Sequence, residues 1–192
     1  MKVRVHKILK NTKVEGPGTR YCIWFQGCSR HCKGCWAKAT WAHDGGEELE
    51  TETILEEILT TKGIEGVTFL GGEPFEQPQA LKFLARGVKE AGLSVLCFTG
   101  GKIEDIKDRE ILNYIDLLID GEYREEEQDF SRPWVGSRNQ RYHFLTDRYD
   151  EKIFTDYKNK IEINIQKNGL IFINGMGDFE KFTQNLDMLT KH

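Results

Sequence analysis

Residues 67–74 read Val-Thr-Phe-Leu-Gly-Gly-Glu-Pro, a strand-forming run that leads directly into a glycine-rich turn. The run does not alternate with charged residues, as expected for a strand that is buried on both faces. Similar runs cover residues 93–98, before Thr-Gly-Gly, and residues 115–119, before Asp-Gly. These three runs predict a parallel sheet whose strands all end in small or polar residues, where α/β folds place their ligands.

Apolar residues recur at helical spacing between these strands. Helices are expected around residues 49–59, 81–88 and 103–112, and further strands over residues 2–9 and 21–26. This alternation of strands and helices makes the predicted fold class α/β, with both faces of the sheet covered.

The pattern changes after residue 150. Isoleucines alternate over residues 161–165 and 171–173, on either side of Asn168-Gly169, which predicts a β-hairpin. A short helix is expected to follow, with apolar residues Phe179, Phe182, Leu186 and Leu189. We therefore predict a core over residues 1–146 and an extension over residues 147–192 that packs on the core.

The composition is that of an ordinary folded protein. The chain has 192 residues, 39% of them hydrophobic, and a formal net charge of −4. It lacks the run of about 20 apolar residues that a membrane span needs, and its first residues lack the apolar region of a signal peptide. We expect a cytoplasmic protein without a membrane partner. The net negative charge does not favour nucleic-acid binding.

Three of the five cysteines, Cys28, Cys32 and Cys35, lie within eight residues. Three buried thiols on one helix face, or a redox pair of Cys32 and Cys35, are alternatives. A zinc site is another, with Cys22, His31 or His43 as a further ligand. An iron–sulfur cluster is favoured because three thiolates would leave one of four irons open to a substrate or cofactor. Cys22 and Cys97 lie in apolar runs and are expected to be buried structural residues.

The gaps of three and two residues between these cysteines resemble the signature of the radical S-adenosylmethionine (SAM) superfamily, and Gly71-Gly72-Glu73-Pro74 resembles its glycine-rich motif. Over roughly residues 14–145 the chain resembles the activating proteins of anaerobic ribonucleotide reductase. The other stretches that carry this resemblance are residues 16–20, 27–28, 34–35, 40–41, 120–121 and 134–140. Gly34 stands where most of the superfamily has an aromatic residue. The activating proteins also have a glycine at this position. Residues 147–192 have no counterpart in the shorter activating proteins.

The resemblance implies a partial parallel (β/α) barrel with a [4Fe–4S] cluster held by Cys28, Cys32 and Cys35 in a loop over residues 28–36. It also implies that SAM binds the open iron and is cleaved by one electron to methionine and a 5′-deoxyadenosyl radical. The expected function is activation of a glycyl-radical enzyme such as anaerobic ribonucleotide reductase. No catalytic residues beyond the cluster and SAM site are expected.

The resemblance also suggests which residues bind SAM. Gly71 and Gly72 would let the backbone approach its methionine moiety, Glu73 would accept from its ammonium group, and Pro74 would stiffen the turn. Further candidates are Thr99, Asp120, Ser137, Asn139 and Trp36. Asp120 is expected to bond a ribose hydroxyl or to cap a turn, and Trp36 to pack on the cluster or on adenine.

A flavodoxin or ferredoxin is the implied electron donor, and it would dock on a basic patch made of Arg30, His31, Lys33 and Lys38. Two other functions stay open. The hairpin extension could serve a free-standing radical SAM enzyme that modifies a peptide, nucleoside or nucleic acid. A non-enzymatic iron–sulfur or zinc binding module is the other alternative.

Overall fold

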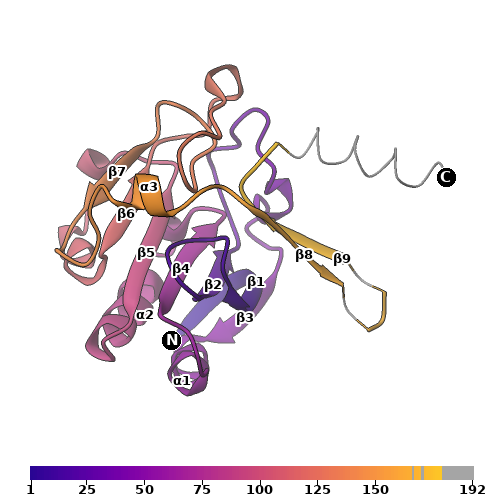
Figure 1. Ribbon diagram of the computed structural model, residues 1–192. Helices are drawn as coiled ribbons and strands as arrows, with labels where there is room; N and C mark the ends of the chain where they lie inside the picture. Colours follow the sequence, from indigo (N-terminus) through magenta and orange to yellow (C-terminus); the bar gives the residue numbers. More distant parts are fainter. Residues whose placement is uncertain (166, 170, 179–192) are drawn as a thin grey trace.

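A computed structural model describes residues 1–165, 167–169 and 171–178, and its main body is a seven-stranded sheet (Figure 1). The strand order is β3-β1-β2-β4-β5-β6-β7. These strands are β1 (Lys2–Thr12), β2 (Arg20–Phe25), β3 (Glu47–Glu50), β4 (Gly66–Gly71), β5 (Ser94–Thr99), β6 (Leu117–Asp120) and β7 (Arg141–Phe144). The α-helices are α1 (Thr51–Thr60), α2 (Pro78–Glu90) and α3 (Ile153–Asp156).

The centre of the sheet is parallel, as the unalternating apolar runs predict. Strands β2, β4, β5 and β6 pair in parallel, whereas β1, β3 and β7 join them in antiparallel register. Within the described ranges, β3 and β7 are the two edges of this open sheet. A mixed α/β sheet is therefore confirmed, and the expected barrel is not.

Both faces of the central strands are covered. Val95 and Cys97 of β5 face one apolar cluster, which includes buried residues of α1 and α2 such as Ile58 and Leu84. Leu96, between them, faces a second cluster that contains Trp134. The second face is thus covered by a loop and the short α3 as well as by neighbouring strands. None of the helices in the described part of the chain is long and apolar enough to cross a membrane.

Two local predictions are wrong. Leu49 belongs to β3, because residues 47–50 pair with β1 before α1 begins. The helix expected over residues 103–112 is instead two 3-10 segments, Ile103–Asp105 and Arg109–Tyr114. The first segment begins where the Ile103 amide donates to Asp120 (2.7 Å), and the second begins after Asp108, whose carboxylate accepts from the Glu110 amide (3.1 Å). The other 3-10 segments are Lys38–Thr40, Pro74–Glu76 and Glu125–Glu127.

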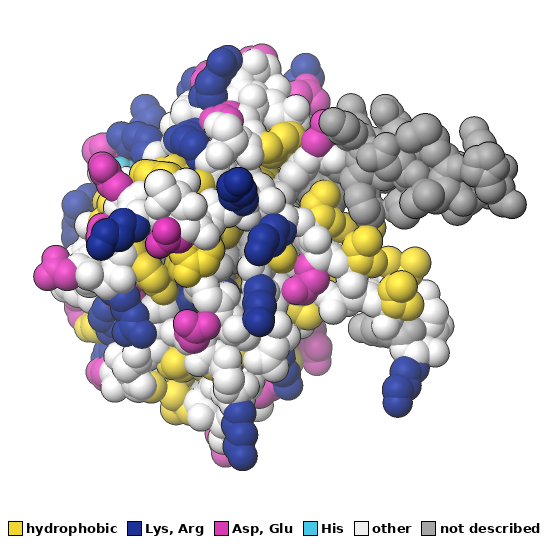
Figure 2. Space-filling model, in the orientation of Figure 1, with side chains coloured by type: hydrophobic (Ala, Val, Ile, Leu, Met, Phe, Trp, Pro, Cys, Tyr) yellow, Lys and Arg dark blue, Asp and Glu magenta, His cyan; other side chains and the backbone are white. Residues whose placement is uncertain are grey.

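The predicted hairpin is confirmed as β8 (Ile161–Ile165) and β9 (Ile171–Gly175) and projects from the main body (Figure 1). Its base is fixed by Asn174, which donates to Thr12 (3.1 Å), and by the Gly175 amide, which donates to Glu15 (2.6 Å). Hydrophobic side chains gather on the hairpin's surface (Figure 2), where the pairs Ile163–Ile173 and Ile165–Ile171 are exposed. The helix expected around Phe179, Phe182, Leu186 and Leu189 lies outside the described residues.

Candidate functional site

The ends of three parallel strands bring most of the predicted SAM residues to one edge of the sheet. Gly71 ends β4, Thr99 ends β5 and Asp120 ends β6. Backbone bonds join the loops that follow, since the Gly121 amide donates to the Gly101 carbonyl (2.8 Å). The structure thus places residues that are up to 50 positions apart in the sequence on a common edge, as expected for parallel strands.

The glycine-rich turn after β4 is built against the start of the cysteine loop. The Glu73 amide donates to the carbonyl of Gly27 (2.8 Å), which directly precedes Cys28. Gly71 has a φ of 106°, a conformation that favours glycine. A Cβ atom at Gly72 would overlap the Gly27 carbonyl. Two glycines are therefore needed for the two motifs to meet.

Glu73 is buried and accepts four hydrogen bonds. Its Oε1 accepts from the Phe75 amide (3.2 Å) and the Thr99 hydroxyl (2.9 Å). Its Oε2 accepts from the Gly100 amide (2.9 Å) and from Arg30 Nε (3.0 Å). The carboxylate therefore ties the end of β4, the end of β5 and the cysteine loop together.

The cysteine loop presents thiols with the surroundings that iron–sulfur ligands have. Backbone N–H groups of Arg30 and His31 bond to the sulfur of Cys28, and that of Tyr123 bonds to the sulfur of Cys32. Such hydrogen bonds tune cluster sulfurs. Burial raises the pKa of both thiols despite these bonds, so a bound metal would be what holds them as thiolates.

The donor set therefore fits an iron–sulfur cluster in its chemistry. Cys28, Cys32 and Cys35 are all free of disulfides. Among the residues described, however, no three His, Cys, Asp or Glu side chains converge on one metal position. The three cysteines share a loop without forming a closed cage, and their role as ligands stays a prediction. Cys22 and Cys97 are buried in the sheet, as predicted, and burial raises their pKa well above the ordinary value.

Asp120 is a buried carboxylate that is already well bonded. Arg141 donates to it from Nε (2.9 Å) and Nη2 (2.6 Å), and the Ile103 amide donates as well. His143 Nε2 lies 3.0 Å from its Oδ2. Burial alone would raise the pKa of Asp120, but these partners hold it below the ordinary value. An anionic carboxylate at this strand end can accept from a hydroxyl group.

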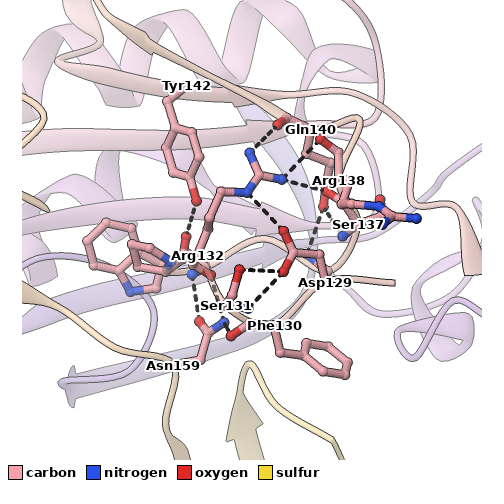
Figure 3. A network of polar contacts seen from close by, with 12 residues as sticks. Asp129, Phe130, Ser131, Arg132, Ser137, Arg138, Gln140, Tyr142 and Asn159 are labelled. Carbon is pink, nitrogen blue, oxygen red and sulfur yellow. Dashed lines mark hydrogen bonds and ion pairs between the residues drawn. The ribbon is translucent and has the colours of Figure 1, made fainter. Parts of the chain in front are cut away.

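Ser137 lies in a loop that Arg132 holds together (Figure 3), and Asn139 belongs to the same stretch of sequence. The Arg132 guanidinium bonds the Asp129 carboxylate (3.0 Å) and the carbonyls of Ser137 (3.0 Å), Arg138 (3.1 Å) and Gln140 (3.0 Å). The Ser137 hydroxyl is buried and accepts from the Arg124 amide (3.2 Å).

The side-chain oxygen of Asn139 accepts no hydrogen bond. Its Nδ2 donates to the Glu122 carbonyl (2.8 Å), and it lies beside Gly121 at the end of β6. Its Oδ1 is buried without a hydrogen-bond partner. A buried acceptor without a donor is costly, so a ligand hydroxyl at this edge would fit it.

Trp36 lies on the outer side of the cysteine loop. Its side chain is 60% exposed and borders a cavity of about 560 Å³, which Cys35, Tyr123 and Asp178 also line. The sequence did not single out Tyr123, Arg141 or His143, because their roles depend on backbone contacts or on a strand that is not apolar. Arg30 and Lys33 of the expected basic patch pair with Glu73 and Glu125 (both 3.0 Å).

The fold and the cysteine loop define the class of protein to which the chain belongs. The family described as "4Fe-4S single cluster domain" matches residues 14–143. The anaerobic ribonucleoside-triphosphate reductase-activating protein of Enterobacteria phage T4 is 35% identical over 140 residues, which cover 70% of this chain and 89% of that protein. That of Escherichia coli (strain K12) is 31% identical over 143 residues, which cover 69% and 92%. The chain belongs to this family of activating proteins.

The family expected from the sequence is thereby confirmed, and with it the expected 4Fe–4S domain. The crystal structure of QueE from Escherichia coli is also similar, with a TM-score of 0.44 and 22% identity over 53% of each chain.

Proposed function

We propose that this chain activates an anaerobic ribonucleotide reductase by generating a radical on a backbone glycine of that partner. The observation that carries the proposal is the contact between the two motifs: the glycine-rich turn bonds, through the Glu73 amide, to the residue before Cys28. The names of the relatives support the choice of partner. When bound, the cluster and SAM supply a one-electron cleavage and a carbon radical.

The protein's own residues would bind and orient these groups. We propose that Cys28, Cys32 and Cys35 hold the cluster, and that Gly71, Gly72, Glu73 and Pro74 receive the methionine part of SAM. The orphaned Oδ1 of Asn139 and the anionic Asp120 support a ribose site at the end of β6. Thr99 and Ser137 would support this edge through their bonds to Glu73 and Arg124, and Trp36 would border the cluster side.

A flavodoxin or ferredoxin in the cytoplasm remains our proposal for the electron donor. The support is Lys33, whose side chain is 87% exposed on the cysteine loop. An acidic donor surface would compete with Glu125 for this ammonium group.

The test is anaerobic iron–sulfide reconstitution, followed by addition of SAM and dithionite and chromatography for 5′-deoxyadenosine. We expect product from the wild type and from Cys97→Ala, the matched control in the sheet, but not from Cys32→Ala. Bound zinc with no iron–sulfur cluster would contradict the proposed enzymatic function and favour a non-enzymatic zinc binding module.

A second experiment tests the partner. A co-encoded anaerobic ribonucleotide reductase is incubated with the reduced protein and SAM, and the glycyl doublet is sought by electron paramagnetic resonance. We expect deuterium from labelled glycine of the reductase to appear in 5′-deoxyadenosine. Turnover of SAM without deuterium transfer to 5′-deoxyadenosine from any reductase that is offered would favour the free-standing radical SAM enzyme.

A further inference from the structure

Arg30 lies inside the cysteine motif but points to the other half of the site. Its Nε donates to Glu73 Oε2 at 3.0 Å, across 43 positions of sequence. The side chain of Arg30 is 38% exposed, whereas that of Glu73 is 3% exposed. The ion pair is therefore formed by a buried acceptor and a cation that reaches it from the solvent side.

The route of this side chain is open because two residues after β5 lack a Cβ atom. A Cβ at Gly100 would lie 2.5 Å from Arg30 Cδ, and one at Gly101 would lie 2.7 Å from Nη2. Neither distance is compatible with the observed position of Arg30.

The four acceptor positions of the Glu73 carboxylate are all used, two on each oxygen. Three of the donors, the Phe75 and Gly100 amides and the Thr99 hydroxyl, belong to the turn after β4 and the end of β5. Only Arg30 is a cation on a long, half-exposed side chain. A second cation that binds Glu73 must therefore displace Arg30.

We propose that Arg30 is a placeholder for the α-ammonium group of SAM: it occupies Glu73 Oε2 until SAM displaces it. This inference rests on the proposed function, in which Glu73 receives that ammonium. Arg30 is thus a positioning residue that holds the cysteine loop on the strand ends in the absence of SAM and lowers the apparent affinity for SAM. Competition from an ion pair that is this exposed should raise the dissociation constant of SAM about five-fold.

The experiment compares two nucleosides on reconstituted protein of matched iron content, by equilibrium dialysis. S-adenosylhomocysteine carries the α-ammonium group and is not a sulfonium, whereas 5′-methylthioadenosine lacks the amino-acid part. In Arg30→Gln we expect the Kd for S-adenosylhomocysteine to fall about five-fold and that for 5′-methylthioadenosine to stay unchanged. Gly101→Ala should lower the Kd for S-adenosylhomocysteine in the same direction but by a smaller factor, because its Cβ forces the end of the Arg30 guanidinium to shift without removing a charge.

Lys33→Gln is the matched control: it removes a cation from the same loop, but one that pairs with Glu125. Its two dissociation constants should equal those of the wild type. An unchanged or higher Kd for S-adenosylhomocysteine in Arg30→Gln and Gly101→Ala would overturn the inference alone. Wild-type protein that binds neither nucleoside would overturn the proposed function, and the inference with it.

Discussion

The anchor of the C-terminal hairpin should make the protein less stable as the pH rises. Glu15 is buried, and its Oε1 accepts from the Gly175 amide (2.6 Å) and from Asn174 Nδ2 (3.3 Å). Burial raises the pKa of Glu15 from 4.5 to about 7, against the smaller opposing effect of these two donors. The perturbation to make is Glu15→Gln, which keeps an acceptor oxygen but cannot ionise.

The direction of this pH dependence follows from which state, folded or unfolded, binds the Glu15 proton more tightly. Because the folded protein holds the Glu15 proton up to about pH 7 and the unfolded chain only to about 4.5, the stabilisation is complete below pH 4.5 and is lost as the pH rises through 7. The difference corresponds to about 3 kcal/mol in the free energy of unfolding. This is an upper value, because local detachment of the hairpin limits the loss.

The assay is urea unfolding at pH 5, 6, 7 and 8, followed by tryptophan fluorescence, with hydrogen exchange over residues 171–178 to detect local opening. The wild type should lose up to about 2.5 kcal/mol relative to Glu15→Gln between pH 5 and 8, because part of the full difference is already lost at pH 5. Glu56→Gln, which removes an exposed carboxylate of α1, should follow the wild type. The reasoning would be refuted if the free energy of unfolding and the hydrogen-exchange rate changed with pH in the same way in the wild type and in Glu15→Gln.

Three other changes test the core and the site. Gly72→Ala places a Cβ against the Gly27 carbonyl and should release iron from the reconstituted protein, as measured by iron content; full retention would show that the two motifs move independently. Asp116→Ala leaves Lys89, Val95 N and Thr146 without their buried acceptor and should lower the free energy of urea unfolding by about 3 kcal/mol. Since its partners lower the pKa of Asp116 despite burial, this stabilisation is complete above pH 3.8 and lost at lower pH; an equally stable Asp116→Ala protein at pH 7 would contradict it. Lys33→Glu should slow cluster reduction by flavodoxin but not by dithionite, and equal slowing would exclude docking there.

The sequence predicts those parts of the fold that depend on local patterns. The runs at 67–70 and 93–98 are recognisable as buried parallel strands because no charged residue interrupts them, and Asn168-Gly169 specifies a hairpin over a few residues. Strand β7 was missed because it reads Arg-Tyr-His-Phe, whose two basic residues are accounted for by Asp120 on the neighbouring strand. The partner of Arg30 could not be predicted either, since the pair depends on how the cysteine loop folds over the two glycines that follow β5.

The hairpin extension is joined to the site through two of its own residues. Gly175 is bonded to Glu15, within the part of the chain that matches the iron–sulfur family, and Asp178, three residues later, lines the cavity beside Cys35 and Trp36. A short segment between a fixed anchor and a cavity wall has little freedom to move while the anchor holds. Loss of the Glu15 contact should therefore change this wall of the cavity before it changes the strand ends, where Glu73 and Asp120 are held by bonds within the main sheet. The extension can in this way affect what reaches the cysteine loop without contributing a ligand to the predicted SAM site.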